Sequence, residues 1–191
     1  MSDNKQSETR STPLPPVDQK FILHWGEMGT RWGINRTVAQ VHALLFLSPK
    51  PLHAEEISSA LAVARSNVSN SLRELQGWGI ARVVHVLGDR RDHFESVKDV
   101  WEIFRIVAEE RKRREIDPTV RVVDECVKDL KEAGAANAYT RERLEEMLGF
   151  LTATSGLFEE MLRLPMPALK GMTRLRGKLK ALLGSSKSAH K

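Results

Sequence analysis

Residues 65–79, RSNVSNSLRELQGWG, form the most informative segment of this sequence. At about 100° per residue, Val68, Leu72 and Leu75 fall on one face of a helix, and that face is expected to be buried. The remaining positions of the first turns carry arginines and short polar side chains, namely Arg65, Ser66, Asn67, Ser69, Asn70 and Arg73. A merely solvated face favours Lys, Glu and Gln, which form helices better than Ser and Asn do. The segment therefore predicts a helix whose polar face approaches another molecule closely.

The major groove of DNA is a surface that such a face fits. Asn bonds adenine and Arg bonds guanine in a bidentate way, while Ser bonds phosphate or base edges. The N-terminal part of a recognition helix is the part that contacts bases. The alternative interpretation is that these Ser and Asn residues act only as helix caps and turn formers.

The segments around this helix follow the order of a winged helix-turn-helix. A short LH strand and the helix of AEEISSALAV precede it, and the strand-like runs IARVVHV and HFESV follow it, joined by the turn LGDRRD. The order helix, short strand, helix, turn, helix, strand, loop, strand is typical of this unit. Further helices follow it, so the predicted fold class is mainly α, with a small β-hairpin wing and additional long helices for dimerisation.

The wing loop adds a second sign of DNA binding. Arg90 and Arg91 stand between the two predicted strands, although arginine is not a turn-forming residue. Two arginines at a loop tip suit contact with phosphate or the minor groove. Asp89 and Asp92 offer the alternative of a neutralised, solvated turn. The combined pattern favours a DNA interface made of Arg65, Ser66, Asn67, Ser69, Asn70, Arg73, Arg90 and Arg91.

These motifs resemble those of a known family. The segment SNVSNSLRELQGWG followed by GDRRDHFE, within about residues 20–116, is similar to the GbsR-type branch of the MarR winged-helix regulators. The resemblance implies a bacterial, cytoplasmic homodimer that binds double-stranded operator DNA and represses or tunes a nearby operon. It also implies an association with choline or glycine betaine.

Composition divides the chain into four predicted parts. These are a disordered N-terminal tail (1–16), a winged helix-turn-helix domain (17–116), a helical dimerisation region (117–165) and a basic C-terminal tail (166–191). The formal net charge is +5. Residues 168–191 contribute +7 of it and the rest of the chain, with 23 basic and 25 acidic residues, contributes −2. We expect the tail to add non-specific attraction to DNA; docking on the protein body or on an acidic membrane surface are the alternatives.

The helical part after the wing carries two further predictions. Asp117 and Pro118 are expected to begin a new helix as its N-cap and first position. A coiled-coil-like seam then repeats at four and three residues, and we expect it to form the dimer interface. The alternative is packing within the chain against the helix of Val120–Leu130. The seam residues are Leu144, Leu148, Leu151, Ser155, Phe158 and Leu162.

Several classes of protein are not expected. The sequence has no run of about 18 apolar residues and no signal-peptide core, so neither membrane insertion nor secretion is predicted. Its one cysteine, Cys126, is expected to be a buried structural thiol in a reducing, cytoplasmic setting. The six histidines lack metal-ligand spacing, although His85 and His93 are expected to face each other across the wing. No catalytic motif is present, so we expect neither an enzyme nor a cofactor.

Aromatic residues suggest where an effector would bind. Trp25 and Trp32 share a stripe of the first helix with Phe21, and Trp101 opens the helix after the wing. Such rings can cage a quaternary ammonium group through cation–π attraction. The alternative is that they are core residues, which the adjacent Gly26, Gly29 and Gly33 favour. The predicted function is therefore a sequence-specific, dimeric DNA-binding regulator, with a winged-helix interaction scaffold as the alternative.

Overall fold

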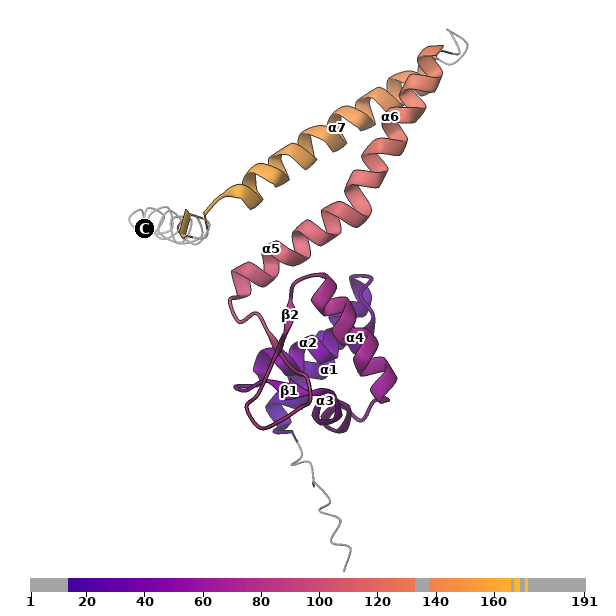
Figure 1. Ribbon diagram of the computed structural model, residues 1–191. Coiled ribbons are helices and arrows are strands. Elements are labelled where there is room, and N and C mark those ends of the chain that lie inside the picture. Colours follow the sequence, from indigo (N-terminus) through magenta and orange to yellow (C-terminus); the bar gives the residue numbers. More distant parts are fainter. Residues whose placement is uncertain (1–13, 133–137, 166, 169–170, 172–191) are drawn as a thin grey trace, which may run out of the picture. The chain divides into compact units, whose positions relative to one another are not determined.

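The computed structural model describes residues 14–132, 138–165, 167, 168 and 171 (Figure 1). Nearly all of the two predicted tails lies outside these residues. The predictions made for the basic segment therefore also fall outside the described part of the chain. The chain divides into two compact units, residues 1–106 and residues 107–191. Each unit is described by itself.

The first unit is the predicted winged helix-turn-helix, and the mainly helical fold class is confirmed. Its elements are α1 (Pro16–Arg31), α2 (Arg36–Leu47), β1 (Leu52–His53), α3 (Ala54–Leu61), α4 (Arg65–Gly77), β2 (Ala81–Val84) and β3 (His93–Ser96). α3 and α4 form the helix-turn-helix, and β2 and β3 form the wing (Figure 1). The last element, α5 (Val100–Arg111), begins in this unit and ends in the second.

The core of this unit lies between α2 and the helix-turn-helix. Val41, Ile57, Val68 and Leu75 are at most 1% exposed, so the apolar face predicted for residues 65–76 is buried. α1 packs closely on α2 because it carries glycine at the contact: a Cβ at Gly29 would lie 2.5 Å from that of Ala39. Gly26 and Gly29 therefore allow the tight helix packing that the sequence suggested, whereas Gly33 lies beyond the end of α1 with nothing within 4 Å of its Cβ position.

The small sheet has the order β1-β3-β2 and is antiparallel throughout. In this register His93 lies opposite Val84 on one side and His53 on the other. The predicted pairing of His85 with His93 is therefore wrong: His85 follows the last residue of β2, and the partner of His93 comes from β1. After β3, Lys98 donates to the carbonyls of Leu45 (2.6 Å) and Ser48 (2.7 Å) and joins the wing to the end of α2.

The second unit begins with a continuous helical run. α5 passes through a π-helical segment, η1 (Lys112–Ile116), into α6 (Asp117–Glu132). Asp117 is the first residue of α6 but not the predicted N-cap of a separate helix, because its φ of −60° and ψ of −41° are helical and the run continues through it. Pro118 lacks a backbone N–H, and its ring would clash with the carbonyl four residues earlier in a regular helix. A π-turn at this point lets the helix continue past the proline.

α6 and α7 (Ala138–Arg163) form an antiparallel hairpin (Figure 1). The predicted seam of α7 is half-buried along its whole length, while Val127 of α6 is 3% exposed. Ion pairs join the helices near both ends, from Lys131 to Glu145 (3.5 Å) and from Lys112 of η1 to Glu159 (2.8 Å). This is the packing within the chain that the alternative interpretation predicted.

Cys126 differs from its predicted state. The thiol is exposed, because the neighbouring Val127 occupies the buried position of α6. Adjacent helix residues are about 100° apart, so only one of the two can face α7.

Candidate nucleic-acid interface

The polar face of α4 is exposed as a whole. Arg65, Ser66, Asn67, Ser69, Asn70 and Arg73 are all exposed, and Ala64 occupies the N-cap position without a side-chain cap. Ser66 and Asn67 are therefore not the caps that the alternative interpretation required. Ser71 is the exception among the short polar residues, since it is 2% exposed and donates to the carbonyl of Asn67 (2.8 Å).

The two wing arginines differ from each other. Asp89 accepts hydrogen bonds from the backbone N–H (3.0 Å) and the Nε (2.9 Å) of Arg91, and these bonds hold the pKa of Asp89 far below its ordinary value. Arg90 is exposed and has no hydrogen-bond or ion-pair partner among residues 14–132 and 138–165. The neutralised turn considered from the sequence thus applies to Arg91 only.

Two grooves flank α4. One, of about 320 Å³, runs between α4 and the wing and is lined by residues that include Arg65, Ser69, Arg73 and Arg91. The other, of about 190 Å³, lies between α4 and the start of α2 and is lined in part by Asn67 and Asn70. The predicted residues are therefore brought to two sides of one helix, and Ser66 and Arg90 line neither groove.

Some residues of these grooves were missed by the sequence reasoning. Gln76 lines the first groove with Glu55, and Thr37 of α2 and its N-cap residue Asn35 line the second. Gln76 lies seven residues after Ser69 and so on the same helix face, so following the polar face for one more turn would have found it. Asn35 and Thr37 carried no such signal, because they come near α4 only through tertiary packing.

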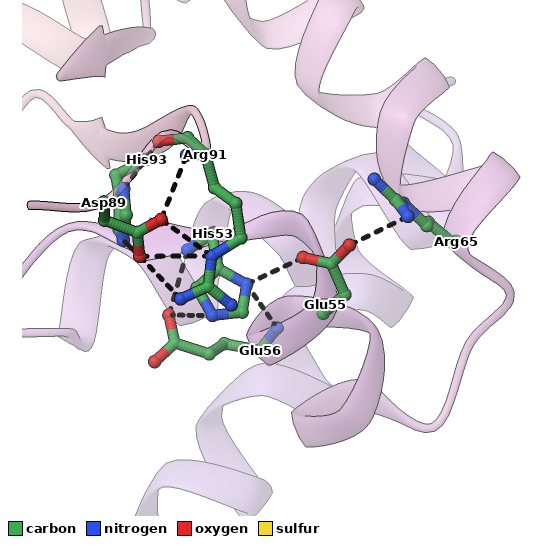
Figure 2. A network of polar contacts seen from close by, with 7 residues as sticks. All are labelled: His53, Glu55, Glu56, Arg65, Asp89, Arg91 and His93. Atoms are coloured by element: carbon green, nitrogen blue, oxygen red, sulfur yellow. Dashed lines mark hydrogen bonds and ion pairs between the residues drawn. The ribbon is translucent and has the colours of Figure 1, made fainter. Parts of the chain in front are cut away.

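A polar network joins α3, α4 and the wing, as Figure 2 shows. Arg65 binds Oε1 of Glu55 with its Nη1 (2.8 Å), and Oε2 of Glu55 lies 3.0 Å from Nδ1 of His53. The rings of His53 and His93 meet edge to face at 5.5 Å, and Nε2 of His93 lies 3.5 Å from Oδ2 of Asp89. Contacts thus run without a break from the first residue of α4 to the wing tip.

The electrostatics of Glu55 reflect this network. Desolvation acts to raise the pKa of Glu55, but a hydrogen bond at its own backbone, the charge of Arg65 and the contacts with His53 together lower it. Glu55 is therefore ionised at neutral pH. Within the described part of the chain, no group of three or more His, Cys, Asp or Glu residues is arranged to hold a metal ion.

The three tryptophans of the predicted ammonium cage have different surroundings. Trp25 stacks on Phe21, with ring centroids 5.4 Å apart, and lies 6.2 Å from the ring of His42. Trp32 is 53% exposed and Trp101 is half-buried. Trp25 is itself 36% exposed, so it is not the buried core residue that the alternative interpretation predicted.

Comparisons with known proteins show what the winged helix is similar to. Residues 32–92 match the MarR family. The chain is 27% identical over 93 residues to YvaV of Bacillus subtilis (strain 168), which bears the name of an HTH-type transcriptional regulator; the match covers 49% of this chain and 52% of YvaV. It is also 27% identical over 88 residues to the HTH-type transcriptional repressor OpcR of the same organism, covering 46% of this chain and 48% of OpcR. The chain thus spans about half the length of these curated relatives.

A solved structure supports the fold. A crystal structure of a transcriptional regulator matches with a TM-score of 0.60 and 21% identity, over 77% of this chain and 96% of that chain. The matched family and relatives are transcriptional regulators and not enzymes, which agrees with the expectation that this chain is no enzyme. No helix among the described residues is long and apolar enough to cross a membrane.

Proposed function

We propose that this chain, in which residues 32–92 match the MarR family, is a sequence-specific DNA-binding transcriptional regulator that works as a cytoplasmic homodimer. One observation carries the proposal: the exposed face of α4 consists of Ser, Asn and Arg side chains beside a wing that presents Arg90. α4 enters the major groove, where its Asn and Arg side chains read base edges. Arg90 contacts phosphate or the minor groove and positions the protein on the duplex.

The finer parts of the proposal rest on resemblance. The motifs of α4 and the wing favour the GbsR-type branch, and repression is favoured by the name of the relative OpcR. The same branch suggests choline or glycine betaine as the effector. Such a ligand regulates only by binding the DNA-competent and DNA-incompetent states unequally.

A homodimer is favoured by an apolar stripe on α7. Tyr139, Met147, Phe150 and Leu157 are between 49% and 75% exposed, and at about 100° per residue they fall on one side of the helix, roughly a third of a turn from the seam. α7 has no fully buried residue among those described, so the hairpin leaves much apolar surface in water. A second copy would cover the stripe, and two-fold symmetry would then demand a pseudo-palindromic operator.

One observation favours the alternative function, a protein-interaction scaffold. Val86 and Leu87 expose apolar side chains on the same wing, at 40% and 104%, and apolar wings suit protein partners better than DNA. The two functions differ in their dependence on DNA sequence and on salt.

Binding of genomic fragments at several salt concentrations tests the proposal, followed by selection of an operator. Asn70→Ala should weaken operator binding by about 1–3 kcal/mol and change binding to random duplex little, because a base contact is lost. Arg90→Ala is the matched variant that removes a phosphate contact. It should weaken binding to the operator and to random duplex alike. It should also reduce the salt slope, which is the slope of log affinity against log salt concentration, by about one unit. A protein that binds no fragment at low salt is a scaffold, and equal losses on both duplexes would give Asn70 a backbone role.

The effector is tested by calorimetric titration of the full chain with choline and with glycine betaine at millimolar concentration. We expect heat of binding and a changed operator affinity for at least one of them. Cation–π contacts contribute about 0.5–2 kcal/mol each, so Trp32→Ala or Trp101→Ala should weaken such binding measurably. Absence of both heat and a change in operator affinity removes these effectors and leaves the tryptophans as packing residues.

A further inference from the structure

Glu55 stands between the DNA interface and a buried histidine. Its Oε1 binds Nη1 of Arg65 at 2.8 Å, and its Oε2 lies 3.0 Å from Nδ1 of His53. The side chain of Arg65 is 67% exposed and that of Glu55 is 44% exposed. A surface pair of this kind contributes little stability, about 0–1 kcal/mol. A DNA phosphate can therefore replace the carboxylate as the partner of Arg65.

Two groups compete for Nδ1 of His53. The same nitrogen accepts the backbone N–H of Glu56 (3.3 Å) as the N-cap of α3 and lies beside the carboxylate of Glu55. A neutral Nδ1 that accepts this N–H carries no proton to donate to Glu55. In protonated His53, Nδ1 donates to Glu55, and the charge of the carboxylate is then shared between two cations (Figure 2).

We propose that Glu55 is a positioning residue that competes with DNA phosphate for Arg65, and that the protonation state of His53 sets the strength of this competition. The inference rests on the proposed DNA-binding function. When His53 is neutral, Glu55 keeps Arg65 from the phosphate backbone and lowers non-specific affinity. When His53 is protonated, Glu55 neutralises less of the charge of Arg65, and Arg65 then binds one more phosphate. Histidine is the side chain whose ordinary titration falls between pH 5 and 8.

Several charged and titratable groups lie around His53. Its side chain is 11% exposed and its ring meets that of His93 of β3 edge to face. The groove beside His53 is also lined by charged groups of α1, the α2–β1 loop, α3 and the wing: Asp18, Lys50, Glu55, Glu56 and Arg91. Asp89 faces His93.

The test measures binding of the full chain to a fluorescein-labelled duplex of random sequence by anisotropy, at several salt concentrations. Glu55→Gln keeps the size of the side chain and removes its charge. We expect tighter binding and a salt slope steeper by about 0.9, the value for one added phosphate contact. In the Arg65→Ala background, Glu55→Gln should change the slope no further. Asp92→Asn is the matched control, because Asp92 lines the same groove and has no ion-pair partner among the described residues.

The histidine is tested by the same slope at pH 5.5 and pH 8. The wild-type slope should steepen by up to about 0.9 at pH 5.5, while Arg65→Ala and His53→Asn should not show this change. Asparagine keeps an N-cap acceptor for α3 and does not titrate; should His53→Asn lose its thermal transition, the comparison with Arg65→Ala alone decides.

The possible outcomes distinguish this inference from the proposed DNA-binding function. Equal slopes for Glu55→Gln and the wild type, or an equal gain in the Arg65→Ala background, overturn this inference and leave DNA binding intact. A wild-type protein that binds no duplex at low salt overturns the proposed function together with it.

Discussion

Leu157→Asp is expected to convert the protein to monomers and to weaken operator binding by about 10²–10⁴-fold, because the two half-sites are then no longer linked. Leu157 is 74% exposed within the protomer, so the substitution costs the α6–α7 hairpin little. In a dimer that covers the stripe, however, a carboxylate at this position would lose its water. Light scattering gives the oligomeric state, and anisotropy with the selected operator gives the affinity.

Two further variants make this test specific. Thr152→Asp introduces the same charge at an exposed position of α7 on the side opposite the stripe and should change neither readout. Leu151→Asp, in the half-buried seam, should lower the stability of the hairpin itself. A Leu157→Asp protein that stays folded and dimeric would move the interface to another surface.

Acid should destabilise the first unit through His42. This side chain is 7% exposed, its Nε2 is buried without a hydrogen-bond partner among the described residues, and its ring lies between those of Trp25 and Phe46. Burial, with the charge of Lys98 adding to it, lowers the pKa of His42 to about 4 from an ordinary value of 6.5. The unfolded chain therefore binds a proton between pH 6.5 and 4 that the folded chain does not bind.

The sign and size of the effect follow from this difference. Stability is complete above pH 6.5 and falls as pH decreases toward 4, by about 3 kcal/mol in total. His42→Phe removes both the titration and the unpartnered nitrogen, so the free energy of unfolding should depend less on pH in this window. Urea unfolding at pH 7 and pH 4.5 measures the difference between variant and wild type. His24→Gln, at an exposed position of α1, is the control and should keep the wild-type dependence.

If His42→Phe and the wild type lose equal stability between pH 7 and 4.5, other groups cause the acid effect. His42→Leu is a second variant without a titrating nitrogen. It replaces His42→Phe if the larger phenylalanine ring disturbs the packing against Trp25.

Much of the winged helix-turn-helix unit was predictable from the sequence, because its elements follow local rules. The burial of Val68, Leu72 and Leu75 and the exposure of the opposite face of α4 follow from helical spacing alone. The wing follows from a β-branched run and a second short strand-like run on either side of a turn. Gly26 and Gly29 predicted a close helix contact, and the structure shows that α1 makes it with α2. These features depend on residues a few positions apart, whose relative directions the backbone period sets.

Only the tertiary structure shows which residues become partners when they are distant in sequence or when their pairing depends on the register of the strands. His53 meets His93 because β1 pairs with β3, and Glu55 reaches Arg65 across the turn between α3 and α4. Arg91 is paired with Asp89 while Arg90 is not, although the two arginines are adjacent in the same turn. The seam of α7 shows the same limit: its repeat predicts a contact, but a helix of the same chain and a helix of a second copy satisfy that repeat equally well. Periodicity specifies which face of an element is apolar, and only the packed structure specifies what covers it.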